Sequence, residues 1–175
     1  MNKLIATIAG GVALAISGAA SATVINGNAL QTVLDDITVG GPSSTNVHTD
    51  QHGLDEQWQI SGSGGSVATM IIELGGYATG NDFGVYDIYD TSKKVELFAG
   101  SNVAGDQALL SIKADGSVYV NFTDSGVDFA GNHFGFFLDN AVGEVFYSQA
   151  DKNADLDGDG DGDDHLVAYQ GKDVD

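Results

Sequence analysis

The feature that most constrains the fold of this chain is the period of its apolar residues, which becomes two from Leu54 onward. Apolar and polar residues alternate along many short runs, and turns rich in Gly, Asp and Asn separate these runs. A period of two places one face of a β-strand in a core and the other in solvent. Many such strands at regular spacing are typical of a sandwich. We therefore predict a mostly β protein, an antiparallel β-sandwich of jelly-roll-like type.

The expected strands share alternating or continuous apolar residues, and each ends at turn residues. They are residues 54–60, 67–74, 83–90, 93–98, 108–113, 117–122, 133–139, 143–149 and 165–170. Asp115-Gly116 lies between two of them and is a strong hairpin signal. Trp58 alternates with Leu54 and Ile60, which favours a place in the core over a sugar-stacking platform.

The part of the chain before the strands reads differently. Apolar residues at helical spacing follow Asn28, a residue that can cap a helix, so one short N-terminal helix is expected over residues 28–37. Residues 39–53 hold the only proline and read as a loop. No internal repeat is present, and we predict a single β-sandwich domain over residues 23–175.

Residues 1–22 have the pattern of a secretory signal peptide. Lys3 supplies a positive start, an apolar stretch follows, and Ala20-Ser21-Ala22 matches the small-residue cleavage site. The apolar stretch is short and rich in Gly and Ala for a membrane span. We expect cleavage after Ala22, no membrane span in the mature chain, and a secreted, extracellular or cell-surface location.

The charge of the chain excludes some partners. It has 25 acidic residues against six basic ones, with a formal net charge of −19 at pH 7. Binding to a nucleic-acid backbone or to anionic lipid requires clusters of cationic residues, so neither partner is expected. An acidic surface attracts cations instead. There is no cysteine, so an exported domain of this size must be held by packing or by metal rather than by disulfides.

One loop concentrates the acidic residues. Seven of the fourteen residues from 151 to 164 are Asp, and several alternate with Gly in the run DLDGDGDGDD. Crowded carboxylates cost energy unless a cation shares them. A site of six to eight oxygen ligands is what Ca²⁺ prefers. We therefore predict a calcium-binding loop at residues 151–164. Its candidate ligands are Asp151, Asn153, Asp155, Asp157, Asp159, Asp161, Asp163 and Asp164.

Two registers for these ligands remain open. Read from Asp155, the loop resembles the D-x-D-x-D-G-x-x-D calcium loop of dockerins and thrombospondin type 3 repeats. It departs from a full EF-hand because Leu166 stands at position twelve. Read from Asn153, the first ligands become Asn153, Asp155 and Asp157. In either register the loop is expected to act as a calcium clip that pins the strands expected at residues 143–149 and 165–170.

Catalytic patterns are weak in this sequence. It contains no cysteine nucleophile and no Gly-x-Ser-x-Gly elbow, so we do not expect an enzyme. His48 and His52 flank an acidic residue and form a weaker candidate for a transition-metal site. Two histidines in a Gly/Ser-rich loop are more often simply solvated.

Several phrases resemble a known family. VATMIIELGGYATGNDFGVYDIYD, ALLSIKADGSVYVNF and DFAGNHFGFFLDN, followed by EVFYSQ and DHLVAYQG, are similar to exported proteins of the PEP-CTERM sorting system. These proteins carry an uncharacterised β-rich domain of the domain-of-unknown-function family 4114 type. The resemblance implies an exported, calcium-loaded module of a Gram-negative cell surface or exopolysaccharide matrix, without an established activity.

Two functions follow as expectations. The first is an exported calcium-binding structural module of the bacterial cell surface or extracellular matrix, which could associate with itself by strand addition. The alternative is a calcium-dependent carbohydrate-binding module with an exopolysaccharide as its partner.

Overall fold

The computed structural model of the protein describes residues 28–53, 56–60, 65–70, 78–140 and 142–169. The expected signal peptide, residues 1–22, lies outside them. The described residues form one α-helix, nine strands and two 3₁₀-helices. In chain order these are α1 (Asn28–Ile37), β1 (Trp58–Gln59), β2 (Gly65–Thr69), η1 (Ala78–Gly80), β3 (Asp82–Asp87), β4 (Asp90–Phe98), β5 (Gln107–Ile112), β6 (Ser117–Val120), β7 (Thr123–Asp128), β8 (His133–Asp139), β9 (Val145–Tyr147) and η2 (Ala150–Lys152).

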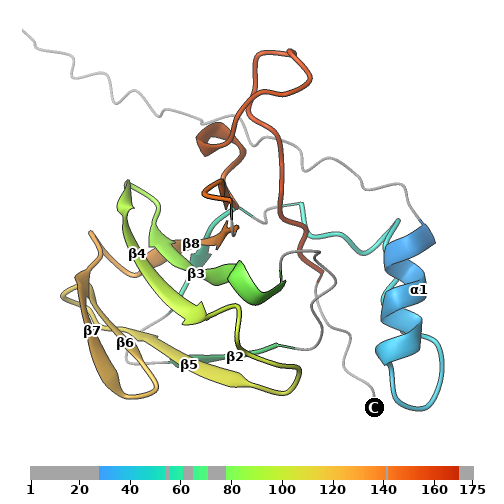
Figure 1. Ribbon diagram of the computed structural model, residues 1–175, viewed down its shortest axis with the longest axis horizontal. Helices are drawn as coiled ribbons and strands as arrows, with labels where there is room; N and C mark the ends of the chain where they lie inside the picture. Colours follow the sequence, from blue (N-terminus) through green and yellow to red (C-terminus); the bar gives the residue numbers. More distant parts are fainter. Residues whose placement is uncertain (1–27, 54–55, 61–64, 71–77, 141, 170–175) are drawn as a thin grey trace, which may run out of the picture.

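The described strands form two antiparallel sheets that face each other (Figure 1). The first sheet has the order β1-β8-β3-β4, and β9 also pairs with β8. The second has the order β2-β5-β6-β7. β8 pairs with strands far away in the sequence, as strands of jelly rolls do, whereas β5, β6 and β7 follow one another as a meander. The prediction of a mostly β, antiparallel sandwich is confirmed.

The core lies between the two sheets, because both contribute buried apolar side chains to one cluster. Its members in the named strands are Val85, Val95, Leu97, Phe98 and Phe134 from the first sheet, and Ala108, Leu110, Ile112 and Val118 from the second. Trp58 packs against this cluster, and its ring meets that of Phe136 edge-on with the ring centres 4.5 Å apart. Trp58 is therefore part of the core, as its alternation predicts.

The hairpin expected at Asp115-Gly116 joins β5 to β6. Gly116 has a φ of +93°, in the left-handed region, and its N–H donates to the carbonyl of Lys113. A β-carbon at Gly116 would also overlap the carbonyl oxygen of Phe129. Both the turn and this close approach require glycine here.

The next hairpin differs from the expectation. The strand expected at residues 117–122 ends at Val120, and Asn121 and Phe122 form a turn with φ values of +50° and +66°. The side-chain oxygen of Asn121 accepts a hydrogen bond of 2.9 Å from the N–H of Leu109, which fixes this turn to β5. The chain then forms β7, a strand that its polar sequence TDSGVD did not predict.

The strand expected at residues 165–170 is wrong for the residues that the structure describes. Residues 165–169 form no strand, and Tyr169 makes a single bridge with Gln51. The N–H of His52 donates to the carbonyl of Ala168 over 2.8 Å. Residues 165–169 therefore lie against an irregular segment and not within a sheet. Of the strand expected at 67–74, residues 67–69 belong to β2, and residues 71–74 lie outside the described residues.

α1 has the bounds that the sequence predicts and lies apart from the two sheets (Figure 1). The side chain of Gln31 donates to the carbonyl of Thr45 and accepts from the N–H of Val47, both over 3.0 Å. These two hydrogen bonds hold the segment that carries the fully buried Val47 against α1. Among the described residues no helix has both the length and the apolar content to cross a membrane.

Candidate metal centre

The acidic loop, residues 151–164, begins in η2, which follows β9 after Ser148 and Gln149, and it projects beyond the sheets (Figure 1). Its far end leads into residues 165–169, which lie beside residues 51 and 52. The two ends of the loop meet, because the N–H of Asp163 donates to the carbonyl of Ala154 over 3.2 Å. The loop therefore forms a closed ring, and the place where its ends meet, at Asn153, Ala154 and Asp163, is called the neck.

Asn153 occupies the neck of this ring. Its side-chain oxygen accepts from the N–H of Tyr147 over 2.8 Å. Its side-chain nitrogen lies within hydrogen-bond distance of the carbonyls of Tyr147 (2.8 Å), Asp163 (2.9 Å) and Gln149 (3.3 Å). One carboxamide thus joins β9, the segment after it and the returning end of the loop.

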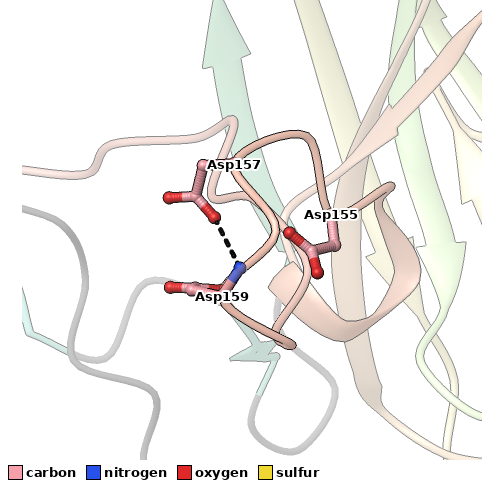
Figure 2. Close-up of side chains that lie close together, drawn as sticks. All are labelled: Asp155, Asp157 and Asp159. Atoms are coloured by element: carbon pink, nitrogen blue, oxygen red, sulfur yellow. Dashed lines mark hydrogen bonds between the residues drawn. The ribbon is translucent and has the colours of Figure 1, made fainter.

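Three carboxylates come together at the tip of the loop. Each of Asp155, Asp157 and Asp159 offers an oxygen atom, and these atoms all lie within 4.8 Å of one another (Figure 2). All three side chains are exposed to solvent. Ca²⁺–oxygen distances are about 2.3–2.6 Å, so two oxygens on opposite sides of one ion lie about 5 Å apart. The spacing of the three oxygens is therefore compatible with one shared Ca²⁺.

The backbone of the tip curls around Asp155. Its two carboxylate oxygens accept from the N–H of Gly158 over 2.6 Å and from the N–H of Gly160 over 3.0 Å. Both glycines have positive φ values, +80° and +98°, which glycine adopts without a steric penalty. The carboxylate of Asp157 accepts from the N–H of Asp159 over 3.1 Å (Figure 2). The alternating glycines thus let successive carboxylates converge, as the sequence pattern suggests.

The other candidate ligands lie outside this group of three. Asp151 forms an ion pair with Lys152 at 2.8 Å. Asp163 and Asp164 each accept a backbone N–H with a side-chain oxygen, from Leu156 and Leu166 respectively, both over 3.1 Å. The N–H of Asp161 donates to the carboxylate of Asp159 over 3.0 Å.

The geometry fits one of the two registers better. The three carboxylates that meet are the first, third and fifth positions of the register that starts at Asp155, and Gly160 occupies the sixth position, where calcium loops of this type make a sharp turn. In the register that starts at Asn153, Asp159 would stand at the seventh position, which supplies a backbone carbonyl, so its converging carboxylate would not belong to the ligand set.

The three carboxylates could hold a metal ion. Three ionised carboxylates so close together repel one another, and a shared cation removes that repulsion. All three donors are oxygens, which suit Ca²⁺ or Mg²⁺ rather than zinc or copper. His48 and His52 belong to no group of three ligand-type side chains within the described part of the chain.

A buried polar network beneath the neck was not predicted from the sequence. The hydroxyl of Tyr86, on β3, donates to the side-chain oxygen of Gln149 over 2.9 Å. The hydroxyl of Ser148 donates to the carbonyl of Glu56 over 2.7 Å and accepts from the N–H of Phe136 over 3.0 Å. These residues are distant in sequence, and no local pattern signals their meeting. The network fixes the segment that carries the acidic loop to both β3 and β8.

Tyr86 in this network gives the fold a dependence on alkaline pH. Burial raises the pKa of Tyr86 to about 12, and the negative charges of Asp151 and Glu56 contribute in the same direction. A raised pKa means that folding favours the neutral phenol, so this stability is present below pH 10 and is lost as the pH rises toward 12. At about 1.4 kcal/mol per pKa unit, we expect the wild type to lose about 2–3 kcal/mol more over that range than Tyr86→Phe.

Urea melts at pH 9 to 12 measure this difference. Tyr89→Phe is the matched control, since Tyr89 is 73% exposed and follows the same strand. It should keep the pH dependence of the wild type. If the free energy of unfolding fell equally with pH in the wild type and in Tyr86→Phe, Tyr86 would not be the cause of the alkaline loss of stability.

The comparisons with known proteins gave no relative. No protein-family model matches the chain. No curated protein and no solved structure matches it either. The resemblance to exported proteins of the PEP-CTERM system therefore stays a prediction from sequence phrases, and the functional argument depends on the geometry of the acidic loop.

Proposed function

We propose that the protein is an exported structural module of a bacterial cell surface or extracellular matrix, and that Ca²⁺ bound in the acidic loop stabilises it. The observation that carries this proposal is the convergence of Asp155, Asp157 and Asp159 within the reach of one ion. The expected signal peptide and the absence of a catalytic pattern in the sequence support it.

The position of the loop gives the ion a structural role. The loop connects β9, at the edge of the first sheet, to residues 165–169, which are held to the irregular segment at residues 51 and 52. An ion at the tip would hold the tip in its curled form, beyond the point where Asn153 joins β9 to the returning end of the loop. The ion would thus stabilise the loop itself, rather than pin two strands as the sequence suggested.

Calcium titration tests the proposal. Extracellular calcium sites have dissociation constants of about 10⁻⁴–10⁻³ M. For a Kd near 10⁻⁴ M, about 10 mM Ca²⁺ would stabilise the folded state by about 2.7 kcal/mol. In a domain of this size the melting temperature should rise by about 5–10 °C over that of chelator-treated protein. Calorimetric titration with Ca²⁺ and thermal melts in parallel make the measurement, with Mg²⁺ as the comparison ion. Absence of saturable binding, or binding without stabilisation, would contradict the clip.

Carbohydrate binding is the less supported alternative. Tyr89 and Phe122 are the most exposed of the described aromatic side chains, at 73% and 86%. They lie at opposite ends of β7. Phe122 directly precedes the first residue of that strand. Tyr89 lies near its last residue, because the neighbouring Asp87 accepts from the N–H of Ala130, two residues after β7 ends. They therefore form no common platform for a sugar chain, and Trp58 packs in the core.

The described edge strands differ in how readily they could pair with a strand of another copy of the chain. β4, an edge of the first sheet, carries Lys93 and Lys94, and charged residues of this kind discourage pairing with another chain. β2, an edge of the second sheet, has the sequence GSVAT and no charge. If copies of this chain add strands to one another, we expect β2 to be the edge that they use.

A further inference from the structure

Asn153 is a candidate calcium ligand in the sequence, but its surroundings point to another role. A carboxamide has one acceptor oxygen and two N–H donors. The oxygen faces the N–H of Tyr147, and the nitrogen faces the carbonyls of Tyr147, Gln149 and Asp163. Both ends of the side chain are thus engaged with backbone groups.

The partners of Asn153 stand on opposite sides of the loop. Tyr147 ends β9, before the acidic loop begins, and Asp163 lies at the end where the loop returns. A second contact holds the same neck, because Gly162 passes directly over η2 and leaves no room for a β-carbon against the carbonyl of Ala150. The hydrogen bonds of Asn153 and this close approach together close the ring at its base.

The base of the ring is anchored in the protein interior. Ser148, Gln149 and Ala150 are buried, with exposed fractions of 1%, 8% and 8%. The hydroxyl and backbone N–H of Ser148 both bond to other segments, to Glu56 and Phe136. A loop that is closed on a rigid base loses less conformational freedom when it binds a ligand, and this raises affinity.

We propose that Asn153 is a positioning residue of the calcium loop and not one of its ligands. It closes the neck in the ion-free protein and so holds the carboxylates of Asp155, Asp157 and Asp159 close enough to share one ion. This inference rests on the proposed calcium function. Aspartate has the same length but no N–H donor, so it cannot bond the three carbonyls.

Asn153→Asp separates the two roles because they predict opposite results. If Asn153 were a ligand, an added carboxylate would keep or raise the affinity for Ca²⁺. As a positioning residue it should lose affinity by about tenfold or more, in the range that supporting residues of metal sites show. The ion-free variant should also melt at a lower temperature. Ala154→Asp adds the same charge next to the neck and keeps Asn153, so it should bind Ca²⁺ at least as tightly as the wild type.

Terbium luminescence gives a readout that a loss of folding alone would not move. Tb³⁺ replaces Ca²⁺, and its lifetimes in H₂O and D₂O count the water molecules on the bound ion. At saturation, Asn153→Ala should have the same number of bound waters as the wild type. One additional water in the variant would show that Asn153 is a ligand and would overturn the proposal.

Amide exchange in the ion-free wild type needs no variant. The N–H groups of Tyr147 and Asp163, which bond across the neck, should exchange much more slowly than the N–H of Leu156 on the exposed loop. Equal rates would overturn the proposal, because the neck would then not be closed without the ion. If the wild type binds no Ca²⁺ while these amides remain protected, the proposed function fails and the closed neck still stands.

Discussion

Replacing Asp155 with asparagine is expected to lower the affinity of the acidic loop for Ca²⁺ by about 100-fold or more, which corresponds to about 3 kcal/mol. The carboxylate of Asp155 accepts from the N–H groups of Gly158 and Gly160 and also offers an oxygen to the group of three. In the wild type both oxygens are acceptors, whereas a carboxamide would place an NH₂ against one of these N–H groups and remove the charge. Asp155→Asn should therefore lose both the ligand and the curl of the loop.

Asp151→Asn is the matched control for this prediction. It removes the same charge from the same loop, but Asp151 pairs with Lys152 and lies outside the group of three. Its affinity for Ca²⁺ should remain within about threefold of the wild type, since exposed ion pairs contribute little. Calorimetric titration of the three proteins makes the comparison. Equal losses of Ca²⁺ affinity in both variants would show that only the overall charge of the loop attracts the ion. An unchanged affinity in Asp155→Asn would show that the ion does not bind at this tip.

The sequence predicts the tip of the acidic loop better than its neck. Alternating Asp and Gly directly imply that successive carboxylates converge, and the structure brings Asp155, Asp157 and Asp159 together. Nothing in the sequence distinguishes an asparagine that binds an ion from one that bonds to backbone. The role of Asn153 depends on β9 and on the return of the loop at Asp163, and both are tertiary contacts.

The same distinction applies to the fold. The strand expected at residues 133–139 has the bounds of β8. Its sequence HFGFFLD is apolar and buried along much of its length, so the apolar pattern alone marks the strand. β7 has no comparable signal, since TDSGVD is polar and largely exposed. Its strand depends on the turn at Asn121 and Phe122, and a phenylalanine with positive φ is not a turn signal that sequence rules contain. Residues 165–169 have the largely apolar sequence HLVAY, which predicts a strand, but they lie against an irregular segment and make one bridge only.

Asp87→Ala is expected to cause the largest loss of stability, about 3 kcal/mol, with a fall in melting temperature of about 10 °C. The side chain of Asp87 is buried, and its two oxygens accept from the N–H of Tyr89 over 2.9 Å and from the N–H of Ala130 over 2.6 Å. It thus ties the turn between β3 and β4 to the connection between β7 and β8. Alanine would remove two hydrogen bonds to a charged acceptor, and each such bond contributes about 1.5–3 kcal/mol.

Asp128→Ala is the control, because Asp128 is an exposed acidic residue at the end of β7, next to the same connection. Its melting temperature should stay close to that of the wild type. Asp87→Asn, which keeps one acceptor oxygen, should fall between the two. Urea and thermal melts measure all three, and a loss in Asp87→Ala no greater than in Asp128→Ala would contradict the prediction. The hydrogen bonds of Asp87 go to Tyr89 and Ala130 and not to the acidic loop. Ca²⁺ should therefore still raise the melting temperature of Asp87→Ala. This result would separate the stability of the sandwich from the effect of the ion.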